Sequence, residues 1–320
     1  MRIVRMRITA AALAVWALGG PACGVDEEGA AADADADTDT DADADTDADA
    51  GSDADADADG DADDCSEDAK LVYVVDANAG FWRFNPETPD DAPFTFVATL
   101  DCDSNGSPFS MAISRHDKAY VLYWGGGGLT SCVGINQVNI HTGACEGLVS
   151  YECGQYGFYT FGMGFATDGP DTTAEKLYVG SAEFDTDGST GNGQLAWIDT
   201  ETWQLTPIGP ISDSPELTGN QNGELWAYYA WADEPRVVQL DKGTGFESNQ
   251  AYLPSEISGA AAFAFAYWGG DFYLFHAPEA ESTTVYRLHD GAFEEWVPAT
   301  ETGFQVVGAG VSTCAPTVVE

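Results

Sequence analysis

One structural unit recurs five times in the chain at a spacing of roughly 45–55 residues, and this repetition constrains the fold more than any other feature. Each unit opens with small and apolar residues, in the segments 110–114, 162–166, 217–221, 262–266 and 307–311. A turn follows, and then a strand centred on one aromatic residue, which is Tyr73, Tyr120, Tyr178, Trp226 or Tyr273. The repeats therefore predict consecutive antiparallel strands rather than helices.

A third strand in each unit ends in a polar turn, in the segments 81–87, 137–143, 195–201, 237–243 and 285–291. Asp, Asn, Gly and Thr at these turns suit hairpins. A shorter fourth strand follows, for example over residues 94–100 or 205–211. Four strands per unit, five units and no helical periodicity predict an all-β fold, a five-bladed β-propeller of four-stranded antiparallel blades. A β-sandwich would also contain many short strands, but not five aligned copies.

The two ends of the repeat region complement each other. The first copy lacks a first strand, and the last copy contains only a first strand. Joined, the segment 306–312 and the strands near 71–75, 81–84 and 94–100 make one composite blade, so we expect a ring closed by both termini. Cys314 follows the first strand of this blade and Cys65 precedes the second. The sequence therefore predicts a Cys65–Cys314 disulfide that fastens the ring.

Four other cysteines lie within the repeats. Cys132 and Cys153 flank one hairpin symmetrically about its turn at 141–144, so an antiparallel register would place them opposite each other. Cys102 and Cys145 would then be left over, and nothing in the sequence brings them together. A zinc site is poorly supported, because the chain has no Cys-x-x-Cys pair and no His at ligand spacing.

Charge is unevenly distributed along the chain. The sequence has 54 acidic and 11 basic residues, a formal net charge of −43, which excludes binding to nucleic acid or to anionic lipid through charge. Residues 24–69 contain 21 Asp or Glu and no Lys or Arg, mostly as Asp alternating with Ala or Thr. We interpret residues 24–64 as a disordered tether. Residues 65–316 are long enough to form the propeller domain.

The N-terminal residues have the pattern of an export signal. Arg2, Arg5 and Arg7 precede an apolar run over 8–18 that is too short to span a bilayer, and small residues lead to Cys23. Residues 1–23 resemble a bacterial lipoprotein signal peptide, although Gly20 stands where Leu is usual. The resemblance implies cleavage before Cys23 and a diacylglycerol, which carries acyl chains such as palmitate, attached to the Cys23 thiol as a membrane anchor. It also implies residence in the outer membrane, since Gly24 rather than Asp follows Cys23. The alternative is a secretory signal cut near Ala22 and a secreted protein.

Two segments partly match a calcium-binding loop, which has carboxylates at positions 1, 3 and 5 and Gly at position 6. Residues 55–60 of the tether match, but such a match arises readily in alternating Asp. In the propeller region, Glu183, Asp185 and Asp187 precede Gly188. These three residues are candidates for a structural Ca²⁺ site, and the alternative is an acidic surface loop. We expect no other cofactor.

Ligands of propellers usually lie on the face formed by the loops between second and third strands and between blades. The residue three positions after each second-strand aromatic should approach this face, which selects Asp76, Tyr123, Ser181, Tyr229 and His276, with Trp124 and Trp231 just beyond. Aromatic residues with polar tips resemble sugar- or peptide-binding surfaces. The alternative is that this column is only the solvated rim of the sheets.

The sequence predicts a cell-envelope lipoprotein, a monomer held to the membrane by its lipid, that displays a propeller for binding an envelope protein or a glycan. A propeller enzyme similar to glycosidases or glutaminyl cyclases is one alternative, but no catalytic residue can be assigned from the sequence. A structural surface component without a pocket is another. A pocket with two or three convergent acids would favour an enzyme, and an aromatic face would favour binding.

Overall fold

The computed structural model describes residues 65–319 except 103–104, 129, 171, 185–189 and 279–280, and it describes only the main chain at 182–184 and 190–192. The predicted signal peptide, Cys23, the tether and its partial calcium motif lie outside the described residues.

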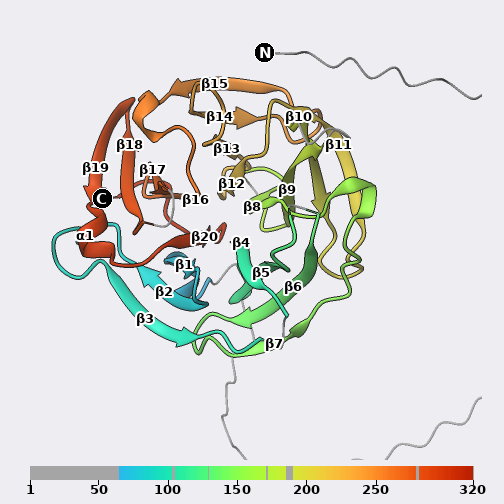
Figure 1. The fold of residues 1–320 in the computed structure, drawn as a ribbon, viewed down its shortest axis with the longest axis horizontal. Helices are drawn as coiled ribbons and strands as arrows, with labels where there is room; N and C mark the ends of the chain where they lie inside the picture. Colours follow the sequence, from blue (N-terminus) through green and yellow to red (C-terminus); the bar gives the residue numbers. More distant parts are fainter. Residues whose placement is uncertain are drawn as a thin grey trace, which may run out of the picture. The chain divides into compact units, whose positions relative to one another are not determined.

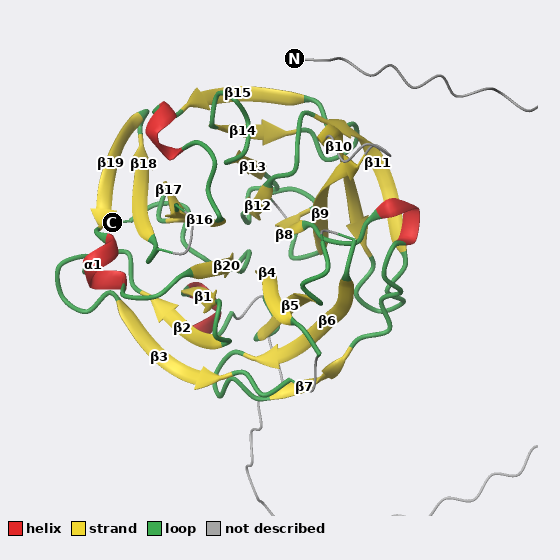
Figure 2. Cartoon of the chain, viewed as in Figure 1, coloured by secondary structure: helices red, strands yellow, loops and turns green. Residues whose placement is uncertain are grey.

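Five antiparallel sheets of four strands each are arranged in a ring (Figures 1 and 2), which confirms the predicted five-bladed propeller. Blade 1 combines β20 (Val306–Val311) with β1 (Val72–Asp76), β2 (Gly80–Phe84) and β3 (Phe94–Thr99). Blade 2 contains β4 (Ser107–Ile113), β5 (Lys118–Trp124), β6 (Cys132–Asn139) and β7 (Cys145–Leu148). Blade 3 contains β8 (Gly162–Thr167), β9 (Glu175–Phe184), β10 (Thr190–Ile198) and β11 (Leu205–Ile211).

Blade 4 contains β12 (Glu216–Gly219), β13 (Leu225–Tyr229), β14 (Arg236–Leu240) and β15 (Glu247–Tyr252). Blade 5 contains β16 (Ala262–Trp268), β17 (Asp271–Ala277), β18 (Thr284–His289) and β19 (Ala292–Val297). Within the described ranges the helices are short: α1 (Ala299–Thr302) and the 3-10 turns Asp68–Lys70, Gln155–Gly157 and Ser255–Ile257. The first strands lie nearest the centre of the ring and the fourth strands at its rim (Figure 1).

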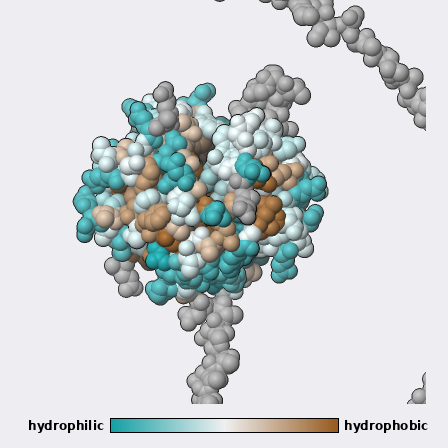
Figure 3. Space-filling view, turned by 60° about the horizontal axis from the view of Figure 1, so that its bottom comes forward, coloured by the Kyte–Doolittle hydropathy of each residue, from teal (hydrophilic) through white to brown (hydrophobic). Residues whose placement is uncertain are grey.

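The hydrophobic core is divided among the five interfaces between neighbouring blades. Each of five buried clusters joins side chains of two adjacent blades. The aromatic residue of each second strand belongs to or packs against one of them, as Tyr120 does against Phe165 and Trp203 of blade 3. The aromatic residues therefore pack blade against blade. In the view of Figure 3, hydrophilic side chains cover most of the rim and apolar ones lie among them toward the middle of the face.

Small residues in the first strands let these strands approach one another around the axis. A Cβ atom on Gly162 would lie 2.1 Å from the carbonyl oxygen of Pro215, and one on Gly219 would lie 2.4 Å from that of Phe165. Such distances are too short for any side chain. The repeated small residues thus reflect crowding of main chain against main chain.

Both termini of the domain contribute to blade 1, as the composite blade requires. β20 pairs antiparallel with β1, with Val311 opposite Val72 and Gly308 opposite Val75. The Cys65–Cys314 disulfide joins the segments next to these strands, with its Cα atoms 5.8 Å apart. The hydroxyl of Ser312 also donates a hydrogen bond to the carbonyl of Ala69 (2.6 Å). The ring is closed covalently where head and tail meet.

Two further disulfides lie in and near blade 2. Cys132 is bonded to Cys153, and Cys102 is bonded to Cys145. Symmetry about the turn at 141–144 would set Ile140 opposite Cys145, and this register was wrong, because Val138 lies opposite Cys145 and the pairing shifts again at a bulge between Gln137 and Val138. Cys153 lies beyond the end of β7, so this bond joins a strand to the following loop. Cys102 precedes β4, and its bond ties the loop between blades 1 and 2 to β7.

Candidate functional site

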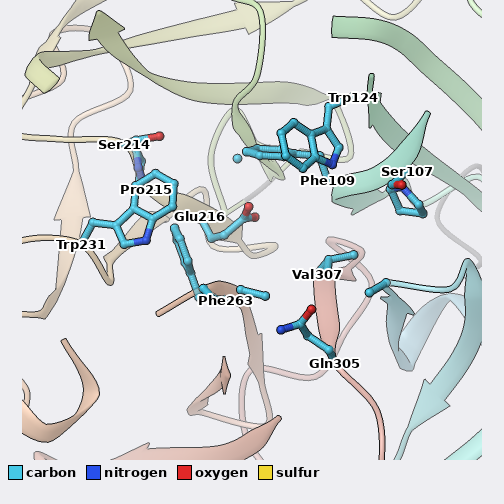
Figure 4. Close-up of a pocket in the computed structure, with 15 residues that line it drawn as sticks. Ser107, Phe109, Trp124, Ser214, Pro215, Glu216, Trp231, Phe263, Gln305 and Val307 are labelled. Atoms are coloured by element: carbon cyan, nitrogen blue, oxygen red, sulfur yellow. The ribbon is translucent and has the colours of Figure 1, made fainter. Parts of the chain in front are cut away.

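A pocket of about 360 Å³ lies at the axis of the ring, at the end where the first strands begin (Figure 4). Ser107, Gly162, Glu216, Ala262 and Val307, which stand at or near the beginnings of the five first strands, all line it. The remaining lining residues come from the first strands β4 and β16, from the loops between blades, and from the ends of second strands or the residues just after them. We call this cavity the axial pocket. Its volume falls in the lower part of the range for small-molecule sites, roughly 300–1,000 Å³.

Two pairs of aromatic residues form walls of the axial pocket. Phe109 and Trp124 of blade 2 have ring centroids 6.0 Å apart and planes inclined at 63°. Trp231, which follows β13, and Phe263 of β16 have centroids 5.1 Å apart and planes inclined at 71°. All four side chains are half-buried, so part of each faces the cavity. The pocket is therefore apolar on two sides.

Glu216, the first residue of β12, lies between these two aromatic pairs (Figure 4). It is 3% exposed, and its carboxylate accepts a hydrogen bond from the hydroxyl of Ser110 (2.9 Å). Burial raises the pKa of Glu216 well above its ordinary value, and hydrogen bonds from Ser110 and the main chain of Met163 lower it by less. Among the described residues that line the pocket, Glu216 is the one ionisable side chain.

Two of the seven residues predicted for the ligand face, Trp124 and Trp231, line the axial pocket. Asp76 is 4% exposed and immediately precedes Ala77, which also lines the pocket. Its carboxylate accepts hydrogen bonds from the main-chain N–H groups of Asn78 and Gly80 and from the indole of Trp82. These bonds fix the turn after β1, so Asp76 supports one wall rather than facing the cavity.

Tyr123, Tyr229 and His276 are buried within the ring and do not line the pocket. Tyr229 donates a hydrogen bond to Glu247 (2.8 Å), and burial lowers the pKa of His276. The alternative of a solvated rim was also wrong for this column, because Asp76, Tyr123, Ser181, Tyr229 and His276 are each at most 4% exposed. The separation of three positions explains this burial, because successive side chains along a strand point to opposite faces of the sheet. A residue three positions after an aromatic points to the opposite face of the same sheet, where the other neighbouring blade covers it.

The sequence interpretation missed Glu216, Phe109 and Phe263 as site residues. A signal for Glu216 was present. The residues immediately before the five aligned first-strand segments are Phe109, Phe161, Glu216, Ala261 and Val306, so one acid interrupts an apolar column. The boundary of the third copy was also placed one residue late, since β12 begins at Glu216 rather than Leu217.

The candidate calcium ligands remain a prediction. Asp185 and Asp187 lie outside the described residues, and only the main chain of Glu183 is described, at the end of β9. Within the part of the chain that the structure describes, no group of three or more His, Cys, Asp or Glu is arranged to hold a metal ion.

A second pocket, of about 450 Å³, lies at the other end of β4 between blades 2 and 3. It contains Glu175, whose carboxylate accepts hydrogen bonds from the main chain of Arg115 (2.9 Å) and the hydroxyl of Thr313 (2.7 Å). Burial raises the pKa of this carboxyl as well. The Arg115 guanidinium donates to the carbonyl of Thr173 (3.2 Å). Because these groups satisfy one another, we assign them a structural role.

The fold and its axial pocket define a β-propeller with a small aromatic-walled cavity. No protein-family model and no curated protein matches the chain. Among solved structures, the crystal structure of TolB from Acinetobacter baumannii is similar, with a TM-score of 0.42 and 16% sequence identity. The match covers 71% of this chain and 52% of that one, so it spans about half of the TolB chain. The propeller assignment therefore rests on the strand order of this chain itself.

The three disulfides are typical of a protein that folds in an oxidising compartment, as exported proteins do. Among the described residues, none of the helices has the length and apolar character needed to cross a membrane.

Proposed function

We propose that this protein is a lipid-anchored binding protein of the cell envelope, and that the axial pocket holds its ligand, either a small molecule or an exposed group of an envelope glycan or protein. The observation that carries the proposal is the pair of aromatic walls, Phe109 with Trp124 and Trp231 with Phe263, around one buried carboxyl group. Half-buried aromatic side chains that line a cavity supply apolar contact area with little loss of side-chain entropy.

The chemistry of the pocket supports binding more than catalysis. Glycoside hydrolysis uses two carboxyl groups that flank the scissile bond. Among the described lining residues the axial pocket offers one, Glu216, and no His, Lys, Arg or Cys stands beside it as a base or nucleophile. A single carboxyl with aromatic neighbours can orient and hold a ligand.

The anchor is supported by the sequence of residues 1–23 and by the disulfides. An acyl chain contributes about 0.8 kcal/mol per buried CH₂, so two or three chains on Cys23 would hold the protein at a membrane. The acidic segment 24–64 would then separate the propeller from the bilayer, since its charges repel one another and the anionic surface.

The test is retention of envelope material by the immobilised chain from residue 23 onward, with Cys23→Ser so that no lipid contributes. We expect envelope glycan or protein to be retained, and Trp124→Leu to reduce retention at least tenfold. Phe246→Ser is the matched control, because Phe246 is 71% exposed and lies outside the pocket. Equal retention by Trp124→Leu and the unchanged chain would refute the axial pocket as the binding site.

A further inference from the structure

The axial pocket holds a buried acid that no basic side chain among the described residues neutralises. Residues 65–320 contain eight Lys and Arg, and none of them lines the pocket. All eight have partners elsewhere. These are Lys70 with Glu67, Arg83 with Asp68, Arg115 with Thr173, Lys118 with Glu146, Lys176 with Asp168, Arg236 with Glu247, Lys242 with Thr167 and Arg287 with Glu294.

A buried carboxylate without a cationic partner is costly, and buried charges in proteins are normally paired. Two hydrogen-bond donors, the Ser110 hydroxyl and the main chain of Met163, stabilise Glu216 only in part, because desolvation still dominates its titration. A positive charge brought into the pocket would supply the missing partner. An anionic ligand would meet no basic group there and would be repelled by the net charge of −43.

The aromatic walls select the kind of cation. A metal ion would require several oxygen ligands, and the described lining residues supply only one carboxylate. A sugar ring stacks best on one flat aromatic face. Here the rings within each pair are inclined at 63° and 71°, so neither pair offers one flat stacking surface, and Glu216 lies between the two pairs (Figure 4). Aromatic rings around a cation attract it through their negative faces.

We infer that the axial pocket binds a small organic cation, a quaternary ammonium or methylated amine, with its charge beside Glu216 and its methyl groups against Phe109, Trp124, Trp231 and Phe263. This inference rests on the proposed function, of which it names the ligand class. Glu216 is the charged partner, and the two aromatic pairs provide the surface that distinguishes a methylated cation from a hydrated ammonium or sodium ion.

The test is calorimetric titration of the chain from residue 23 onward (Cys23→Ser) at pH 8 and constant ionic strength. Choline is the probe, and 3,3-dimethyl-1-butanol is its uncharged counterpart of the same shape. We expect choline to bind at least about tenfold more tightly than the alcohol. Phosphocholine should bind more weakly than choline, because its phosphate meets no basic group. Tighter binding of phosphocholine would overturn the assignment to a free cation.

Variants separate the contribution of the charge from that of the rings. Glu216→Gln should weaken choline binding at least tenfold and leave the alcohol unchanged, whereas Glu175→Gln, which alters the buried acid of the second pocket, should change neither. Trp124→Leu should weaken choline binding and Trp124→Phe should restore most of it. The Trp124 pair keeps the test decisive even if Glu216→Gln does not fold.

Equal affinity for choline and the alcohol, or no binding of choline at all, would overturn the cation inference. The proposed function would survive that result if Trp124→Leu still abolished retention of envelope material. If Trp124→Leu changed neither retention nor choline affinity, the pocket itself would be the wrong site, and both proposals would fall.

Discussion

Removal of the Cys65–Cys314 disulfide tests how much the covalent closure of the ring contributes to stability. The two cysteines are 249 residues apart in sequence, whereas Cys132 and Cys153 are only 21 apart. The chain-entropy relation gives about 5.5 kcal/mol for the long loop and about 3.4 kcal/mol for the short one. The double variant Cys65→Ser/Cys314→Ser should therefore lose about 2 kcal/mol more than Cys132→Ser/Cys153→Ser.

The measurement is urea unfolding of both double variants and the unchanged chain. With a slope near 3 kcal/mol per molar, as suits a domain of this size, the first variant should unfold at a urea concentration lower by about 2 M. Amide hydrogen exchange should rise most in β20 and β1, because these strands pair directly next to the lost bond. The reasoning is refuted if the Cys132/Cys153 variant loses as much stability, or if β20 exchanges no faster than the other first strands.

Three other predictions concern the anchor, the buried acid and the crowded axis. Palmitate labelling in cells should disappear in Cys23→Ala, and its persistence would contradict the lipid anchor. Since burial raises the pKa of Glu216, the folded state holds its proton to higher pH than the unfolded chain does, and stability falls as pH rises through that interval. Glu216→Gln should thus melt at a higher temperature than the unchanged protein at pH 8 but not at pH 4. If the two proteins differed in melting temperature by the same amount at both pH values, this linkage would be contradicted. Gly162→Val should lower the free energy of unfolding, measured with urea, by more than about 2 kcal/mol, because the new Cβ would lie 2.1 Å from the Pro215 carbonyl oxygen. Gly169→Ala is the control and should change it little, because no atom lies within 4 Å of the Cβ position there.

The ring itself could be predicted from the sequence because its determinants are local and repeated. Period-two strands, polar turns and small first-strand residues recur in each copy, so each copy supports the interpretation of the others. The Cys65–Cys314 bond followed from the same argument, since the composite blade brings its two partners to one turn. Cys102 and Cys145 could not be paired in this way because their bond joins the loop between blades 1 and 2 to β7, and the repeats do not predict where that loop lies.

The axial pocket could be predicted only in part. Trp124 and Trp231 were found because they lie at the end of a second strand or just past one, and the ends of these strands lead to this face. Glu216 was missed because its importance comes from burial among residues far away in sequence, such as Ser110, which is 106 positions earlier. The predicted β6–β7 register was wrong by two residues next to the turn, where Val138 lies opposite Cys145. Beyond a bulge it was still wrong by one residue, since Asn136 lies opposite Leu148, and turn symmetry reveals neither the true turn nor the bulge.

The central claim is that the axial pocket is a binding site for an organic cation. A crystal structure of the chain grown with choline tests it most directly. The account predicts choline between the Phe109–Trp124 and Trp231–Phe263 pairs, with its nitrogen closer to the Glu216 carboxylate than to any other charged group. An empty pocket at saturating choline, or choline bound only elsewhere on the molecule, would contradict it.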